Sequence, residues 1–302
     1  MRVLVAGATS VPGLPLVREL TARGHDVVGL TRSSSKASDV EAAGGRPVVA
    51  DVFDAAAIAR VVSDIEPEAV VSLLTTLPKW GPMRAKDFEP ARKLWSSGAS
   101  NLVAAAQGAG VRRVVAESVI FAYGYPSNGP ALMDETDPCP GPPPKGGAAM
   151  LEALRGMERT VLSSGEHSGT EGIVLRYGCF YGRGVPHDEL FVRLAKWWAL
   201  PAITGTGIVS WIHIDDVARA TADALDRGRG GQMYNIVDDQ PQSFADYVRE
   251  LSAKLHRPQP LPISHRLVGL VAPYPATAFG TTWLPLANAK AKAELGLRPI
   301  RR

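Results

Sequence analysis

Apolar and polar positions along the chain follow two alternating patterns. Short valine-rich apolar runs, typical of strands buried on both faces, are separated by segments whose apolar residues recur at helical spacing. The first run is Arg2–Ala6, and Leu14, Val17 and Leu20 follow on one face of a helix. This alternation predicts an α/β fold with a doubly wound parallel sheet covered on both faces. Further strands are expected at residues 26–31, 47–52, 69–75, 111–117, 172–177 and 232–237, and another begins within 210–217.

Helical spacing also marks the segments between and after these strands. Helices are expected at residues 55–63, 91–109, 148–162, 190–198, 218–227, 243–255 and 288–295. Residues 77–90 predict a loop or broken helix over a crevice, and residues 258–285 are rich in proline and apolar residues. Residues 124–147 have no periodicity, and an irregular stretch of that length is usually functional or disordered.

The turn between the first strand and the first helix carries the clearest chemical signal. It reads Gly7-Ala8-Thr9-Ser10-Val11-Pro12-Gly13. The first amides of a helix lack internal partners and its dipole favours an anion, so this context predicts a site for a dinucleotide pyrophosphate. Ser10 replaces the middle glycine of a G-x-x-G-x-x-G turn, and we expect its hydroxyl to donate to a phosphate. The alternative is a tight turn without a ligand. The expected cofactor residues here are Gly7, Thr9, Ser10, Val11 and Gly13.

The end of the second strand indicates which dinucleotide is bound. An acidic residue there would accept a hydrogen bond from a ribose 2′-hydroxyl, but this chain has Arg32 and Ser33 after Thr31. A guanidinium among hydroxyls suits a 2′-phosphate, so NADP is favoured over NAD, the alternative being a basic surface loop. After the third strand, Asp51 and Val52 are expected to meet the adenine.

Composition narrows the class of protein. The chain has 302 residues, 45% of them hydrophobic and 21% charged, as in globular proteins, and its net charge of +3 is too mild to indicate nucleic-acid binding. No apolar run reaches the roughly 18–20 residues of a membrane span, and the first strand leaves no room for a signal peptide. Cys139 and Cys179 have no partner motif, which fits a cytoplasmic protein without a metal site.

Several motifs in order resemble the extended short-chain dehydrogenase/reductase family, the group of NAD-dependent epimerases and dehydratases. The matching stretches are GATSVPG (7–13), ADVFD (50–54), VVSLLT (70–75), GVRRVVAES (110–118), AYG (122–124), VLRYGCFYGRG (174–184), WIHIDDVA (211–218), YNIVDD (234–239) and NAKAKAELGLRP (288–299).

The resemblance implies a fold, a domain division and further site residues. It implies a Rossmann-type sheet of about seven strands with a smaller C-terminal substrate lobe. We expect a nucleotide-binding domain of residues 1–182 with 209–239 and a lobe of residues 183–208 with 240–302. Within it Arg176, His213 and Asp216 look structural. The remaining cofactor residues are expected to be Leu73, Leu74, Thr75 and Tyr177.

The same resemblance shows a departure at the catalytic positions. Members of this family use a tyrosine as general acid/base, with a lysine four residues later that lowers the pKa of the phenol. Counting back from Glu158 places Met150 and Leu154 at these positions. The family's serine position holds Val119, and its asparagine position holds Trp95. Candidates for a substitute group are Ser118, Tyr123, Lys145, and Tyr177 or Tyr181, for which packed or solvated roles are the alternative.

These features predict an NADP-dependent oxidoreductase of an atypical extended type. The tryptophans favour a small substrate that is aromatic or polyketide-like, although core packing would also explain them. The alternatives are a non-redox isomerase, cyclase or lyase on the same scaffold, and an NADP-sensing regulatory protein. Pairing into a homodimer is left open. The tryptophans are Trp80, Trp95, Trp197, Trp198, Trp211 and Trp283.

Overall fold

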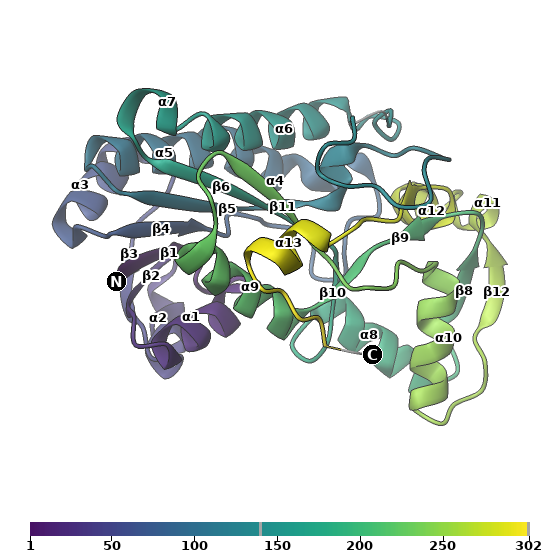
Figure 1. The fold of residues 1–302 in the computed structure, drawn as a ribbon. Coiled ribbons are helices and arrows are strands. Elements are labelled where there is room, and N and C mark those ends of the chain that lie inside the picture. The colour runs from purple at the N-terminus through teal and green to yellow at the C-terminus, as the bar shows by residue number, and fades with distance from the viewer. Residues whose placement is uncertain (139–140, 301–302) are drawn as a thin grey trace.

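A computed structural model of the protein describes residues 1–138 and 141–300, so Cys139 lies outside the described residues. Its centre is a parallel seven-stranded sheet in the order β11-β6-β5-β4-β1-β2-β3, which confirms the predicted α/β class (Figure 1). Valine and isoleucine fill these strands because both faces are covered. The strands are β1 (Arg2–Ala6), β2 (Asp26–Thr31), β3 (Arg46–Val49), β4 (Ala69–Ser72), β5 (Arg113–Val119), β6 (Glu171–Tyr177) and β11 (Gln232–Ile236).

Helices cover the two faces of the sheet in separate layers (Figure 1). One layer holds α1 (Gly13–Ala22), α2 (Ala37–Ala42) and α9 (Ile214–Arg227). The other holds α3 (Ala55–Ile65), α5 (Ala99–Gly108) and α6 (Ala148–Leu162). Shorter helical segments are η1 (Ser34–Lys36), η2 (Ala85–Phe88), α4 (Glu89–Lys93), the π-helical turn η3 (Leu94–Gly98), η4 (Ile120–Tyr123), α7 (Gly165–Ser168) and α13 (Ala289–Glu294).

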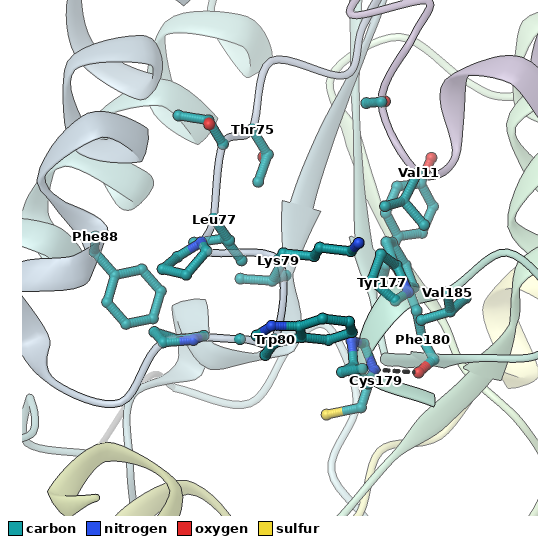
Figure 2. Close-up of a pocket in the computed structure, with 18 of the residues that line it drawn as sticks. Val11, Thr75, Leu77, Lys79, Trp80, Phe88, Tyr177, Cys179, Phe180 and Val185 are labelled. Carbon is teal, nitrogen blue, oxygen red and sulfur yellow. Dashed lines mark hydrogen bonds between the residues drawn. The ribbon is translucent and has the colours of Figure 1, made fainter. Parts of the chain in front are cut away.

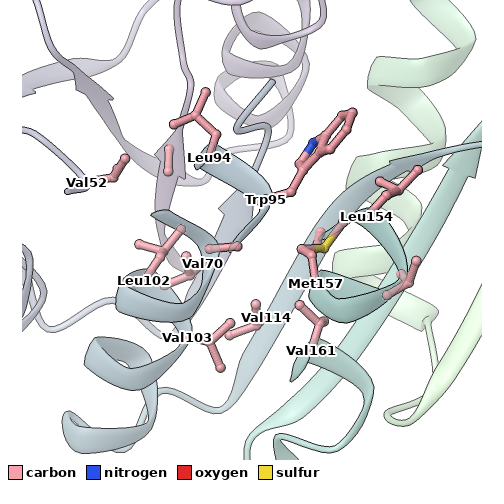
Figure 3. Packing of buried hydrophobic residues seen from close by; sticks show 14 of the residues in the cluster. Val52, Val70, Leu94, Trp95, Leu102, Val103, Val114, Leu154, Met157 and Val161 are labelled. Atoms are coloured by element: carbon pink, nitrogen blue, oxygen red, sulfur yellow. The ribbon is translucent and has the colours of Figure 1, made fainter. Parts of the chain in front are cut away.

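Apolar packing fixes α6 and α5 against the sheet. Figure 3 shows Val70 of β4 and Val114 of β5 facing Leu102 of α5 and Met157 of α6, and all four side chains are buried. Each such side chain contributes about 1.5–3 kcal/mol when it leaves water. This packing holds the amino-terminal half of α6, with Met150 and Leu154, at the edge of the sheet where β4 and β5 end.

Segments between residues 179 and 284 build a smaller region beside the sheet (Figure 1). Two-stranded parallel pairs join β7 (Cys179–Tyr181) to β10 (Trp211–His213), β8 (Pro201–Thr204) to β12 (Leu261–Ser264), and β9 (Ile208–Val209) to β13 (Trp283–Leu284). The helices there are α8 (Pro186–Lys196), α10 (Phe244–Lys254), α11 (His265–Val268) and α12 (Pro273–Gly280). The division into domains at particular residues stays a prediction.

Element boundaries are the main differences from the sequence prediction. The strands predicted at 47–52 and 69–75 end at Val49 and Ser72, because the residues that follow turn toward a cavity. The helix predicted at 190–198 begins at Pro186, where proline and two acidic residues suit the first turn. The helix predicted from 218 begins at Ile214, since His213 Nδ1 accepts a hydrogen bond from the Asp215 amide at 3.2 Å.

One further prediction needs correction. Residues 91–109 do not form one regular α-helix, because the π-helical turn η3 interrupts it and carries Trp95. Residues 258–285, for which the sequence analysis named no elements, contain β12, α11, α12 and β13. Among the described residues, we find no helix with the length and apolar character needed to cross a membrane.

Candidate functional site

A cavity of about 820 Å³ opens at the carboxyl ends of the central strands. One end is formed by the glycine turn after β1 and the residues after β2, and the other by α6 and the smaller region. Ligands of open α/β sheets bind at this edge, so the position marks the site. Residues 77–83, predicted to lie over the crevice, line its opening. Figure 2 shows Lys79 extending toward Tyr177, with its Nζ 4.7 Å from the centroid of the Trp80 ring.

The glycine turn has the shape of a phosphate cradle. Gly7 has a φ of +82°, and a Cβ at this position would lie 2.3 Å from the carbonyl oxygen of Leu73. A Cβ on Gly13 would lie 2.3 Å from the Gly7 carbonyl oxygen, so only glycine fits both positions. Ser10 lines the cavity, and its Oγ is buried without a hydrogen-bond partner in the described part of the chain. A buried hydroxyl of this kind requires a partner, and a phosphate oxygen meets that need.

Cations and hydroxyls surround the end of β2. Arg32, Ser33 and Lys36 line the cavity, and the two cationic side chains are exposed. The Ser33 and Ser35 hydroxyls are 2.7 Å apart. Thr31 stands where an acidic residue would otherwise select a ribose 2′-hydroxyl. The donor set therefore suits a dinucleotide that carries an additional phosphate.

Most of the cofactor residues expected from the sequence meet at this cavity. Those that line it are Gly7, Thr9, Ser10, Val11, Arg32, Ser33, Val52, Leu73, Leu74, Thr75 and Tyr177. Gly13 is buried against Gly7 behind the turn. Asp51 is exposed and outside the lining, and its Oδ1 accepts a hydrogen bond from the Phe53 amide at 3.0 Å.

The far end of the cavity is apolar where the family has its catalytic pair. Met150 and Leu154 both line the cavity and are 4% and 1% exposed. Val119 and Trp95, at the family's serine and asparagine positions, line it as well. All four positions therefore face the cavity, as the resemblance implies, but these side chains cannot transfer a proton to or from a substrate oxygen.

Tyr177 lines the cavity, but it is fully buried and its hydroxyl lies 2.6 Å from the Thr221 hydroxyl. The other four candidate substitutes lie away from the cavity lining. Ser118 donates to Glu158 Oε1 at 2.6 Å, and Glu158 also binds Arg176 at 2.7 Å in a buried ion pair. The buried Tyr123 hydroxyl donates to the Asp134 carbonyl at 3.0 Å, and burial raises the pKa of Tyr123 to about 12.

Tyr181 and Lys145 are also outside the cavity lining. The Tyr181 ring packs edge-on against His213 and Tyr247, and Lys145 is exposed in the proline-rich stretch. Their proposed proton-transfer roles receive no support from these positions.

Sequence reasoning missed Glu117, the residue that precedes Ser118 on β5. Glu117 is the only acidic side chain among the described residues that line the cavity, and it is 6% exposed. Burial raises the pKa of Glu117 to about 8, although the Thr75 hydroxyl donates a hydrogen bond to its carboxylate. The signal was one carboxylate at the end of the apolar run VRRVVAE, which the search for a tyrosine and a lysine passed over.

Aromatic rings enclose the remaining part of the cavity. Phe88 and Tyr274 lie 4.8 Å apart by ring centroids, and Phe121 stacks on Tyr125 at 5.2 Å. The Tyr125 and Tyr274 hydroxyls bond to each other at 2.9 Å, so this wall presents little polar surface. Trp211, Phe244 and Phe279 form another part of the lining. No cluster of described residues has the ligands to hold a metal ion.

Comparison with known proteins agrees with this geometry. The sequence profile of the NAD dependent epimerase/dehydratase family matches residues 3–237. The chain belongs to this family. It is also 37% identical over 308 residues to a protein of a Streptomyces species named 3-diazoavenalumate denitrifying reductase, with 99% of this chain and 96% of that protein covered.

A second relative and a solved structure are also similar to the chain. A ketoreductase of Stigmatella aurantiaca, named for 4-hydroxy-2-methyl-3-oxo-4-farnesyl-3,4-dihydroquinoline-1-oxide, is 25% identical over 82% of this chain and 71% of its own length. The crystal structure of UDP-glucose 4-epimerase from Thermus thermophilus in complex with NAD superposes with a TM-score of 0.79, covering 99% and 94% of the two chains at 22% identity. The protein is thus an NAD(P)-dependent oxidoreductase or epimerase-like enzyme of the extended short-chain dehydrogenase/reductase type.

Proposed function

We propose that the protein is an NADPH-dependent reductase of a small, largely apolar aromatic molecule. One observation carries this proposal. A single cavity joins the phosphate cradle at the glycine turn, with the cations Arg32 and Lys36 beside it, to a chamber of aromatic rings. Gly7, Ser10 and the helix that follows would hold the pyrophosphate. Arg32, Ser33 and Lys36 would hold a 2′-phosphate through charge-assisted hydrogen bonds. When bound, the nicotinamide supplies a hydride to the substrate.

The aromatic walls indicate the substrate class. A planar substrate would gain contact area with Phe121, Tyr125 and Tyr274, while few fixed polar groups would be left unpaired. Sugar nucleotides fit this surface less well, because their hydroxyls would need hydrogen-bond partners in an apolar chamber. The names of the two reductases support acceptors with a ketone or a diazo group.

Titration of the purified protein with NADPH and with NADH measures the affinity for each and tests the choice of cofactor. The loss of nicotinamide absorbance on addition of a panel of aryl ketones, or of aryl diazo compounds, tests the reaction. We expect preferential NADPH binding and NADPH oxidation with at least one panel. Failure to bind either nucleotide would contradict the proposal. Tight binding of NADPH without turnover of either panel would favour the alternative of an NADP-sensing regulatory protein.

A further inference from the structure

Among the described residues that line the cavity, Glu117 has the one carboxyl group, and its surroundings differ from those of a carboxylate with a structural role. Glu117 lies two residues before the end of β5, beside Leu175 of β6, and on the strand face opposite to Ser118. Among the described residues, its Oε2 is buried without a hydrogen-bond partner. The ion pair of Glu158 with Arg176 shows how this fold neutralises a structural carboxylate, and the described residues give Glu117 no such cation.

A short chain of hydrogen bonds orients this carboxyl group. The Trp95 indole Nε1 donates to Thr75 Oγ1 at 3.4 Å, and the Thr75 hydroxyl donates to Glu117. Oε2, which has no hydrogen-bond partner among the described residues, remains available for a proton and a ligand. Burial favours the protonated form, which donates a hydrogen bond instead of accepting one.

We propose that Glu117 is the proton-carrying group of this cavity, in the role that the family assigns to a tyrosine at the position of Met150. This inference rests on the proposed reductase function. Reduction of a neutral acceptor requires one hydride from NADPH and one proton. With a ketone, the Glu117 O–H bond breaks and its proton forms the hydroxyl on the carbonyl oxygen as the hydride reaches the carbon. With a neutral diazo compound whose diazo carbon is conjugated to a ring carbonyl, the hydride goes to that carbon as dinitrogen leaves, and the Glu117 proton goes to the carbonyl oxygen, which becomes a hydroxyl.

Charge balance connects the ionisation of Glu117 to the oxidation state of the nucleotide. After the step, the side chain is a carboxylate that the Thr75 hydroxyl stabilises. The oxidised nicotinamide ring carries a positive charge and the reduced ring does not, so an ionised Glu117 nearby favours NADP⁺ over NADPH. Solvent returns the proton when the nucleotides exchange.

Other titratable groups face the same cavity, and their ionisation also changes nucleotide binding with pH. Burial, and to a lesser extent the charge of Glu117, raises the pKa of Tyr177 on β6, while burial lowers the pKa of His187 on α8. The titratable side chains that line the cavity with Glu117 are Arg32, Lys36, Lys79, Tyr125, Tyr177, Cys179, His187 and Tyr274. A matched variant is needed to attribute a pH effect to one of them.

Binding of NADP⁺ and NADPH as a function of pH tests the proposal without turnover. The quantity to compare is the ratio of the affinities for NADP⁺ and NADPH. Titration of the 2′-phosphate does not affect this ratio, because both nucleotides carry that group. A charge close to a titratable group shifts its pKa by about one unit or more, so the ratio should move toward NADP⁺ by about tenfold between about pH 6.5 and 9. Glu117→Gln keeps the shape and the Thr75 hydrogen bond, and its ratio should not change with pH.

Two more variants make the result specific. Glu135→Gln removes a half-buried carboxylate that is outside the cavity lining and whose pKa is also raised by burial. This variant should retain the pH-dependent ratio. Thr75→Val removes the hydrogen bond that lowers the pKa of Glu117 and should move the transition to higher pH. A constant ratio in the wild type, or an unchanged transition in Glu117→Gln, would overturn the proposal. If neither nucleotide binds, the result would instead overturn the proposed function.

Discussion

The two ends of the cavity differ in how strictly their residues are determined. At the nucleotide end, Gly7 and Gly13 must be glycine, because a Cβ at either position would lie 2.3 Å from a backbone carbonyl oxygen. At the reactive end, Met150 and Leu154 occupy the family's catalytic positions without disturbing α6. A cradle made by the backbone permits few solutions, whereas proton transfer depends on side chains that can be moved to another element. The comparison explains how one family keeps its cofactor site while its catalytic groups change.

The largest expected effect is at the glycine turn. Gly7→Ala introduces strain at a φ of +82° and a collision with the Leu73 carbonyl oxygen, so we expect a loss of about 3 kcal/mol or more in the free energy of unfolding and no NADPH binding. Gly24→Ala is the matched control, because Gly24 has a φ of +81° and open space around it. It should cost about 1 kcal/mol and retain binding. Denaturant unfolding and fluorescence titration measure both, and equal effects would contradict the cradle.

The next largest effect is expected at the buried ion pair of Glu158 with Arg176. Ser118 donates a hydrogen bond to this pair, and we expect it to act there and not in catalysis. Glu158→Gln leaves the Arg176 guanidinium without its carboxylate, which should lower the free energy of unfolding by about 3–5 kcal/mol. Ser118→Ala removes one hydrogen bond to Glu158 and should cost about 1 kcal/mol. Turnover of Ser118→Ala should stay near that of the wild type. A large loss of turnover with little loss of stability would return Ser118 to the catalytic site.

Glu117 should also affect stability without any ligand. Its folded-state pKa of about 8 exceeds the ordinary value of 4.5, so the unfolded chain loses the proton first as pH rises. The wild type should therefore lose stability relative to Glu117→Gln between about pH 4.5 and 8, by a total of about 2–4 kcal/mol. Thermal unfolding of both proteins at about pH 5 and 8 checks this. A constant difference between them would show that the buried carboxyl ionises normally.

The smallest predicted effect is at Arg32, one of the cations that line the nucleotide end of the cavity. Arg32→Ala should weaken NADPH binding by about 1.5–3 kcal/mol, roughly tenfold to more than a hundredfold, and leave NADH binding nearly unchanged. Arg60→Ala, an exposed arginine on α3 outside the cavity lining, is the control for net charge. Equal weakening of both nucleotides by Arg32→Ala would remove the assignment of a 2′-phosphate site.

Sequence reasoning was most successful where the backbone restricts the residue type. The glycine turn, the buried strands and α6 were predicted because tight turns, two-sided burial and helical spacing leave direct traces in sequence. Glu117 was missed because one carboxylate at a strand end resembles a surface residue until the neighbouring strands bury it. Ser118 and Tyr123 were misleading, since their partners Glu158 and Asn235 are distant in sequence.

A crystal structure of the protein with NADPH tests the central claim most directly, namely that one cavity joins a phosphate cradle to a reactive end without the tyrosine and lysine. We predict that the 2′-phosphate contacts Arg32, that Ser10 Oγ binds a pyrophosphate oxygen, and that the nicotinamide lies between Glu117 and Met150. A nucleotide bound elsewhere, or one whose nicotinamide points away from Glu117 and Met150, would contradict it.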